Sequence, residues 1–291
     1  MVSSFRPISL VTGATDGIGR ATAARLLQQG HQLILHGRNA DKLAAVAAEL
    51  ADLGEIQTML ADFASLADVS RLADEICEQH GRLDVLVNNA GLLTDHRQLS
   101  HDGFELTFAV NYLAPWLLTN RLLELLRQSA PARIVNVSST AMGGGEINIS
   151  DLQAEHSFNG WSAYANSKLA NVLFSNLLAE KLSDSGVVSN ALCPGLIDTN
   201  FFHTNTVFAN GAYERMRPGM RAPEAGADIP VYLAASPDAQ DVSGRFYLRG
   251  RSHSEREGFR SVALDWDQEL AVQLWDFSKS CVAPWLGSMQ D

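Results

Sequence analysis

A tyrosine and a lysine four positions apart, Tyr164 and Lys168, form the pair in this sequence best suited to proton transfer. In a helix, residues i and i+4 lie on one face, so the two side chains can meet. A phenol with a pKa of about 10 is a poor acid or base at neutral pH, and a nearby ammonium lowers that pKa by favouring the phenolate. The pair could therefore exchange a proton with a reacting oxygen, although taken alone it would more often be a surface pair.

Three further polar residues could complete that chemistry. Ser138 and Ser139 follow the apolar run Ile134–Val137, and they compete for one role, a hydrogen bond to a substrate oxygen. Strand alternation places the two serines on opposite sides. Asn111 lies within a long, mostly apolar segment, where by itself it would be only a mid-helix polar residue.

A glycine-rich turn, TGATDGIG at residues 12–19, follows the first apolar run of the chain. Glycines let the backbone turn tightly and approach a phosphate, and the N-terminus of the next helix attracts anions through its free N–H groups and its dipole. The spacing is GxxxGxG and differs from the GxGxxG dinucleotide fingerprint. Its place at the first strand-to-helix turn favours a diphosphate site over an ordinary tight loop.

Short apolar runs alternate with helix-like segments from residue 8 to residue 248. This alternation predicts a parallel sheet covered on both faces, and right-handed crossovers make it a doubly wound, Rossmann-type α/β fold. We expect helices near 18–29, after Asn39 as N-cap, and near 66–80, 104–127, 162–182 and 223–235. The expected seven strands are Ile8–Thr12, Gln32–His36, Ile56–Ala61, Asp84–Asn88, Arg133–Val137, Val187–Cys193 and Arg245–Leu248.

No linker-like stretch divides the 291 residues, so we expect a single domain, 1–291. Residues 140–160 and 199–221 show no clear element and exceed the usual length of loops in compact domains, so we expect both to be active-site loops. Residues 250–291 follow the last expected strand as a C-terminal extension.

Charge and composition exclude several classes of function. Lys plus Arg is 22 and Asp plus Glu is 33, a formal charge of −11 without a basic run, which argues against nucleic acid as a partner. Three distant cysteines and scattered histidines form no disulfide framework and no metal site, and they fit a reducing compartment. No apolar run reaches the ~18 residues of a membrane span, and we see no signal peptide. We expect a cytoplasmic protein without a metal or a membrane span.

Five ordered motifs resemble the short-chain dehydrogenase/reductase family. TGATDGIG is similar to its glycine motif, and NNAG at 88–91 to the motif after its fourth strand. PG at 194–195, followed by Thr199, is similar to its segment after the sixth strand. IVNVSS at 134–139 and YANSKLAN at 164–171 resemble most the retinol-dehydrogenase-like branch, although we expect no N-terminal membrane anchor. Ser139, Tyr164 and Lys168 match the family's Ser…Tyr-x-x-x-Lys triad, and Asn111 matches its helix asparagine.

The resemblance implies hydride transfer between a nicotinamide and an alcohol or carbonyl group. Tyr164 is then the general acid when a carbonyl is reduced and the base in the reverse direction. Ser139, rather than Ser138, holds the substrate oxygen, because the family uses the second serine of this pair. Lys168 reaches the nicotinamide ribose, and Asn111 holds a water that relays protons to Lys168.

The resemblance also assigns the cofactor contacts. Gly37 stands where NAD-selecting members carry an acid, and Arg38 can bind a 2′-phosphate, so we expect NADP(H) rather than NAD(H). Asp62 and the backbone N–H of Phe63 are expected at the adenine, although Asp62 could equally cap a helix or a turn. Asn89 could serve only to join adjacent strands. The other expected cofactor residues are Gly13, Thr15, Asp16, Gly17, Ile18, Gly19, Asn88, Ala90, Gly91, Pro194, Gly195, Ile197 and Thr199, together with Tyr164 and Lys168.

Residues 199–208 combine three phenylalanines and a valine, and no Arg or Lys occurs before Glu214. Burying each such apolar side chain gains ~1.5–3 kcal/mol, so these residues either anchor the loop to the sheet edge or line an apolar pocket. The second possibility favours an uncharged, lipophilic alcohol or carbonyl substrate. An epimerase or lyase that uses the cofactor transiently, and a non-catalytic NADP(H) sensor, remain alternatives. A monomer and a homodimer are both compatible with the sequence.

Overall fold

The computed structural model describes residues 6–203, 205–209, 211–249 and 258–287. Its centre is an eight-stranded sheet with the strand order β3-β2-β1-β4-β5-β6-β7-β8. The first seven strands run parallel, and the order reverses next to β1, which is the predicted doubly wound arrangement. The strands are β1 (Ile8–Val11), β2 (Gln32–Gly37), β3 (Ile56–Leu60), β4 (Val85–Asn88), β5 (Ala132–Val137), β6 (Val187–Leu192), β7 (Phe246–Arg249) and β8 (Phe259–Val262).

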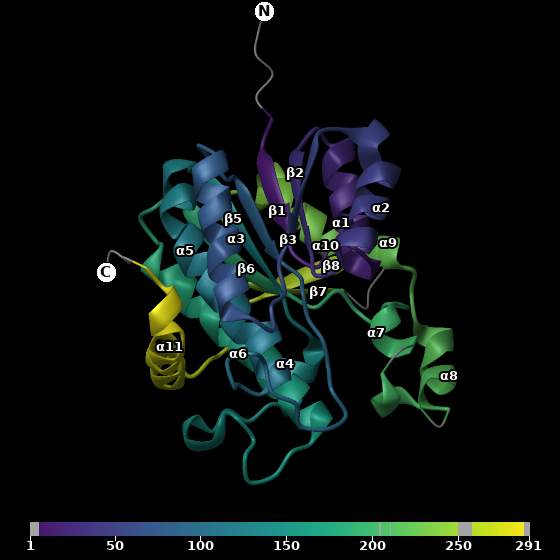
Figure 1. Ribbon diagram of the computed structural model, residues 1–291, viewed down its shortest axis with the longest axis vertical. Coiled ribbons are helices and arrows are strands. Elements are labelled where there is room, and N and C mark those ends of the chain that lie inside the picture. Colours follow the sequence, from purple (N-terminus) through teal and green to yellow (C-terminus); the bar gives the residue numbers. More distant parts are fainter. Residues whose placement is uncertain (1–5, 204, 210, 250–257, 288–291) are drawn as a thin grey trace, which may run out of the picture.

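Helices cover both faces of the sheet (Figure 1). Helices α1, α2 and α10 pack on one face, and α3, α5 and α6 pack on the other. Because both faces are covered, the central strands are apolar and buried along their length. The helices are α1 (Gly17–Gln28), α2 (Ala40–Leu50), α3 (Leu66–Gln79), α4 (Leu106–Phe108), α5 (Ala114–Gln128), α6 (Gly160–Lys181), α7 (Asn200–His203), α8 (Ala212–Met216), α9 (Pro223–Gly226), α10 (Asp228–Ala235) and α11 (Gln268–Val282).

Polar side chains define where the sheet-covering helices begin. The predicted N-cap Asn39 accepts a hydrogen bond from the backbone N–H of Lys42 at 2.9 Å. Ser65 caps α3 in the same way through the N–H of Asp68 at 3.2 Å. These contacts satisfy N–H groups that have no partner inside the helix, and so they set the helix starts.

The sheet has one strand more than the seven expected from the sequence. Strand β8 pairs antiparallel with β7 and lies in the region interpreted as a C-terminal extension. It is four residues long, and its two central residues, Arg260 and Ser261, are exposed. A segment this short, in which half of the residues are polar, has too little hydrophobic periodicity to be predicted as a strand from the sequence alone.

Helix α11, also within that extension, belongs to the core. It packs against α6, and its Trp275 ring lies 5.0 Å from the ring centroid of Trp116 in α5 and 5.8 Å from that of Phe174 in α6. The Ser278 hydroxyl donates to the Tyr112 hydroxyl at 2.9 Å. The extension therefore covers the outer sides of the two long helices. No helix in the described ranges is both long and apolar enough to cross a bilayer.

The two segments expected to be loops contain short helices. Residues 140–144 and 149–151 form 3₁₀ turns. The second segment contains α7 and α8, which stand beside the main body at the right of Figure 1. Helices of four and five residues complete barely one turn, so they leave no apolar stripe in the sequence. Nearly all of the predicted helix 104–127 is helical, but it is interrupted by a π-helical turn at Ala109–Leu113.

Candidate active site

The carboxyl ends of four parallel strands bring the candidate residues to one edge of the sheet. Val11 pairs with Val87, Asn88 with Asn136, and Val137 with Leu192. The glycine turn after β1, the NNAG segment after β4, the serines after β5 and the PG segment after β6 therefore leave the sheet side by side. Ligands of doubly wound folds bind at this edge, where the strand order reverses.

Helix α6 brings Tyr164 and Lys168 to the end of β5. The hydroxyl of Tyr164 is hydrogen-bonded to that of Ser139. The Lys168 Nζ lies 5.5 Å from the centroid of the Tyr164 ring and donates to the carbonyl of Val137 at 3.0 Å. The structure thus places Ser139, Tyr164 and Lys168 together, with Lys168 only 4% exposed.

The two adjacent serines have different surroundings, as strand alternation predicts. The Ser138 hydroxyl is buried and donates to the backbone carbonyl of Lys168 at 2.7 Å. Ser139 is partly exposed, and its Oγ accepts a hydrogen bond from the N–H of Ala141 at 3.1 Å in addition to its contact with Tyr164. Ser138 therefore ties α6 to β5, and Ser139 is the serine available to a substrate.

The pKa values of the pair correct one expectation. Burial raises the pKa of Tyr164, and the hydrogen bond with Ser139 opposes this only in part. Burial also lowers the pKa of Lys168 to about 8. The expected lowering of the phenol pKa is thus wrong for the protein's own groups, because the Lys168 ammonium is directed at the Val137 carbonyl and desolvation dominates.

Asn111 lies in the π-helical turn, a type of irregularity that is frequent at functional sites. Its side chain accepts from the N–H of Leu92 and donates to the carbonyl of the same residue, both at 2.8 Å. It also donates to Ser167 at 2.9 Å, and Ser167 donates to the carbonyl of Tyr164 at 2.7 Å. The side chain thereby positions the turn of α6 that carries Tyr164, and both of its N–H donors are used within the protein.

The glycine turn has the geometry that a diphosphate requires. Gly13 and Gly17 have φ angles of +64° and +52°, which favour glycine. A Cβ on Gly13 would lie 2.9 Å from the Cα of Ala90, and one on Gly19 would collide with the carbonyl of Gly13. In the described part of the chain, the N–H groups of Ile18 and Gly19 at the start of α1 have no protein acceptor. These free donors fit the anionic end of a dinucleotide.

The adenosine end of the expected site surrounds the last residue of β2, Gly37. A Cβ on Gly37 would lie 2.5 Å from Cγ2 of Thr15, so Thr15 occupies the space that an acidic side chain would need. Arg38 is exposed, and it has no hydrogen bond or ion pair with another described side chain. Asp62 accepts from the N–H of Ala64 at 3.0 Å, the turn role that the sequence left open for it.

Fewer side chains of the NNAG segment, residues 88–91, face the expected cofactor site than the sequence predicted. Asn88 donates to Thr119 at 3.0 Å and to Asn136 at 2.9 Å inside the core, so its side chain faces away from the expected ribose. Asn89 donates to the carbonyl of Thr12 at 2.9 Å and therefore joins the ends of β4 and β1. Ala90 and Gly91 remain at the open edge, partly exposed and exposed respectively.

The PG segment returns the chain to the glycine turn. Gly195, next to the buried Pro194, has a φ of +97°. Ile197 is buried, and Thr199 lies against Gly17, since a Cβ on Gly17 would be 2.9 Å from the Thr199 Cγ2. Asn200 is hydrogen-bonded to Asp16, the N-cap of α1. Thr199, which is expected at the nicotinamide, thus lies next to Gly17 in the turn that is expected to hold the diphosphate.

We define the aromatic segment as residues 199–203 and 205–208. The ring centroid of its Phe201 lies 5.3 Å from that of Tyr164 and 5.9 Å from that of Phe208. The ring centroid of Trp161, which is 47% exposed, lies 5.7 Å from that of Tyr164 and 6.5 Å from that of Phe208. The aromatic segment is also joined to the chain after β4, where Asn205 donates to the carbonyl of Leu93 at 2.6 Å. An apolar wall therefore adjoins the Tyr164 ring.

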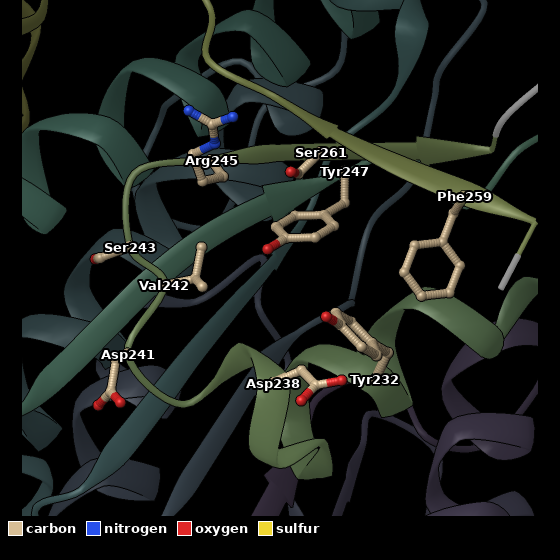
Figure 2. Close-up of a pocket in the computed structure, with 9 residues that line it drawn as sticks. All are labelled: Tyr232, Asp238, Asp241, Val242, Ser243, Arg245, Tyr247, Phe259 and Ser261. Atoms are coloured by element: carbon tan, nitrogen blue, oxygen red, sulfur yellow. The ribbon is translucent and has the colours of Figure 1, made fainter. Parts of the chain in front are cut away.

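A groove of about 690 Å³ lies elsewhere, between the β7–β8 hairpin and α10 (Figure 2). The rings of Tyr232, Tyr247 and Phe259 meet along it. Four of the polar residues that line it precede β7 and so lie at the amino end of that strand: Asp238, Asp241, Ser243 and Arg245. This groove is at the opposite edge of the sheet from Ser139, Tyr164 and Lys168.

Three residues that support the site were not singled out from the sequence. Thr12 accepts from the N–H groups of Asn89 and Ala90, Ser167 links Asn111 to α6, and His36 contacts the glycine turn. Of these, only His36 carries a sequence signal, because it follows the buried apolar run at 33–35 without being apolar. The contacts of the other two depend on which strands become neighbours.

Comparison with known proteins agrees with this geometry. A family model described as short chain dehydrogenase matches residues 7–208. The chain is 38% identical over 289 residues to retinol dehydrogenase 14 of Mus musculus, covering 94% of this chain and 85% of that protein. It is 33% identical over 285 residues to polyprenol dehydrogenase of Homo sapiens, covering 94% and 84%.

A solved structure extends the comparison to the fold. The Pseudomonas aeruginosa RhlG/NADP active-site complex superposes with a TM-score of 0.68 at 29% identity, covering 82% of this chain and 93% of that one.

Proposed function

Because this chain belongs to the short-chain dehydrogenase family, we propose that it is an NADP(H)-dependent oxidoreductase that interconverts an uncharged, lipophilic alcohol and the corresponding carbonyl compound. The observation that carries the proposal is the Ser139–Tyr164–Lys168 cluster at the end of β5, beside a glycine turn with free N–H donors. A proton donor, a hydrogen-bonding hydroxyl and an anion site on one edge are what carbonyl reduction by a nicotinamide requires.

The residues have separate tasks in this reaction. Tyr164 donates the proton to the carbonyl oxygen, and Ser139 donates a hydrogen bond to the same oxygen as negative charge develops on it. Lys168 places positive charge behind the Tyr164 ring, and Ser138 and Asn111 hold the relevant turn of α6. The dinucleotide, when bound, supplies or accepts the hydride.

The protonation state of Tyr164 suits the role of general acid in carbonyl reduction. Burial raises the pKa of its hydroxyl, so the phenol keeps its proton in the absence of other charges. A protonated phenol is ready to act as the general acid, whereas alcohol oxidation first requires its deprotonation.

Two observations support NADP(H) as the cofactor. Position 37 is glycine, so the acid that would bind a free ribose is absent, and a side chain there would require Thr15 to shift. The exposed Arg38 follows directly and can pair with a 2′-phosphate. The NADP named in the complex of the similar Pseudomonas aeruginosa structure is consistent with this choice. Ile18, Gly19, Ala90, Gly91, Ile197 and Thr199 would then line the rest of the dinucleotide.

The aromatic segment supports a lipophilic substrate. The rings of Phe201 and Trp161 both adjoin the Tyr164 ring, and no Arg or Lys occurs in residues 199–213. The names of two relatives, a retinol and a polyprenol dehydrogenase, indicate substrates of this class in those proteins. Since α11 covers the outer sides of α5 and α6, through which family members often dimerise, we propose a monomer. A cytoplasmic location remains a prediction.

A panel of neutral aldehydes, ketones and alcohols tests the proposal. Purified protein is mixed with NADPH or NADP⁺, and the nicotinamide absorbance is followed with each compound. We expect net NADPH consumption with lipophilic carbonyls. Conversion of a substrate without net change in nicotinamide absorbance would indicate the epimerase or lyase alternative, and NADPH binding without turnover of any compound would indicate a sensor.

A further inference from the structure

A buried histidine, His36, lies directly beneath the glycine turn. It is the fifth residue of β2, follows the apolar residues 33–35, and is only 3% exposed. A polar ring in the core of a parallel sheet is costly unless both of its nitrogens are hydrogen-bonded. The contacts of those two nitrogens show what the ring holds in place.

The two nitrogens of His36 reach two different segments. The N–H of Gly13 donates to Nδ1 at 3.3 Å, and Nε2 lies 3.0 Å from the carbonyl of Ala61. A backbone N–H can only donate and a carbonyl can only accept, so the proton is on Nε2 and Nδ1 is the acceptor. Burial lowers the pKa of His36 to about 4, which keeps this neutral form at physiological pH.

The ring also contacts the chain after β3. It stacks on Phe63, with ring centroids 4.3 Å apart and planes inclined by 21°. Ala61 and Phe63 flank Asp62, so one side chain ties the glycine turn to residues 61–63. The backbone carbonyl of His36 adds a further contact by accepting from the N–H of Ala14 at 2.9 Å. The two segments joined in this way are the diphosphate end and the adenosine end of the proposed dinucleotide site.

We infer that His36 is a positioning residue for the dinucleotide, which holds the glycine turn and residues 61–63 at a set separation through a neutral ring. The inference rests on the proposed function, because a dinucleotide is the ligand that must contact both segments. His36 also occupies the N–H of Gly13, which is therefore not available to the ligand, whereas the N–H groups of Ile18 and Gly19 are. Without the ring, binding would have to order the turn, and affinity would fall while the chemical step stayed intact.

Three substitutions separate the contacts of His36. His36→Phe keeps the aromatic volume beside Phe63 and removes both hydrogen bonds. His36→Asn keeps an acceptor close to the Nδ1 position, and His36→Gln keeps a donor close to the Nε2 position. We expect the dissociation constant for NADPH, measured by nicotinamide fluorescence, to rise about fivefold to tenfold in His36→Phe. The asparagine variant should stay nearer to wild type than the glutamine variant, because it retains the contact with Gly13.

Two further measurements distinguish positioning from a general loss of stability. We expect kcat at saturating NADPH to stay within about twofold of wild type in His36→Phe, since both of the hydrogen bonds that are removed are remote from the reacting atoms. In the cofactor-free protein, we expect amide hydrogen exchange of residues 12–19 to become faster in His36→Phe than in His36→Asn.

His31 supplies the matched control. It is also buried, its Nδ1 lies 2.7 Å from the Ser9 hydroxyl, and it precedes β2 at the end opposite to the glycine turn. His31→Phe should lower stability and leave the NADPH dissociation constant unchanged. A folded His36→Phe protein with wild-type NADPH affinity and wild-type exchange at 12–19 would overturn the inference, as would an equal loss of affinity in His31→Phe.

The remaining outcomes are also decisive. If His36→Phe does not fold, equal NADPH affinities for the asparagine and glutamine variants overturn the inference, and a higher affinity for asparagine supports it. If the wild-type protein binds neither NADPH nor NADH, the proposed function fails. The exchange of residues 12–19 then still shows whether His36 holds the turn.

Discussion

The strand-end edge and the aromatic segment meet at Tyr164, but different kinds of contact hold them. At the edge, Ser138, Asn111 and Lys168 each bond a backbone group of a neighbouring element, and all three are buried. In the aromatic segment, the main contacts are between rings such as Phe201 and Tyr164, and they are partly exposed. Hydrogen bonds to backbone define one geometry, whereas ring contacts can adjust to different shapes.

This difference predicts how each region responds to substitution. A reaction that depends on a proton at one atom is lost when that atom is moved or removed. A pocket wall built from several rings loses only one share of its contact area when a ring is truncated. We therefore expect the largest effects at the strand-end edge and the smallest in the aromatic segment.

The largest effect is expected for Tyr164→Phe. Removing the hydroxyl removes the general acid, so turnover should fall about 10²–10⁴-fold, while the ring contacts with Phe201 and Trp161 persist. NADPH affinity should stay within a few fold, as measured by fluorescence. Tyr112→Phe is the control, because its buried hydroxyl only contacts Ser278. Turnover close to wild type in Tyr164→Phe would remove Tyr164 from the mechanism.

Arg38→Ala tests the cofactor end of the same edge. A charge-assisted contact with a 2′-phosphate is worth ~1.5–3 kcal/mol, so the preference for NADPH over NADH should fall by about one to two decades. The ratio of the two dissociation constants measures this directly. Arg127→Ala, an exposed arginine in the last turn of α5, should leave the ratio unchanged. Equal affinities for both cofactors in the wild-type protein would refute the role of Arg38.

Lys168→Met should separate stability from activity. The folded-state pKa of Lys168, about 8, is below its ordinary value of 10.5, so the buried ammonium destabilises the protein below pH 8, and this cost disappears as the pH rises toward 10.5. After allowing for the lost hydrogen bond to Val137, we expect the free energy of unfolding at pH 7 to rise by about 1–2 kcal/mol while turnover is lost.

Urea denaturation at pH 7 and pH 10 measures this effect. The gain from Lys168→Met should shrink at the higher pH, because the wild-type lysine then loses its charge in the folded state. Lys42→Met, at an exposed position in α2, provides the comparison and should change little. A variant that is less stable than wild type at both pH values would show that packing, and not the buried charge, dominates at this position.

The smallest effects are expected in the aromatic segment. For substrate pairs that differ only by a carboxylate, the neutral member should have the higher kcat/KM by about tenfold or more, because residues 199–213 offer no Arg or Lys to pair with a carboxylate beside these rings. Phe201→Ala should lower kcat/KM for the neutral member only a few fold. A consistent advantage for the charged member would instead point to Arg215, Arg217 and Arg221 as a substrate anchor.

Much of the strand-end edge follows from local sequence patterns. Each of the seven parallel strands is a short apolar run, and Asn39 caps α2 at the predicted position. Tyr164 and Lys168 share a helix face because of their spacing, and the alternation of Ser138 and Ser139 follows from strand geometry. These features depend only on neighbours in the chain, and a periodic pattern records such neighbours.

Other features depend on neighbours that are distant in the chain. Strand β8 exists because β7 offers it a partner, and α11 becomes part of the core because Trp116 and Phe174 lie beneath Trp275. The short helices α7 and α8 lack a sequence pattern of their own. None of these was visible as local periodicity.

By itself, the sequence determined the doubly wound fold, the glycine turn and the residues suited to proton transfer, because their spacing and apolar patterns act within single elements. Only the tertiary structure decided the environment of those residues. It placed His36 between Gly13 and Ala61, directed the Asn88 side chain into the core, and raised the pKa of Tyr164 instead of lowering it. The physical reason is that desolvation and hydrogen bonding depend on which segments pack together, and residues from 23 to 184 positions apart in the chain meet at this edge.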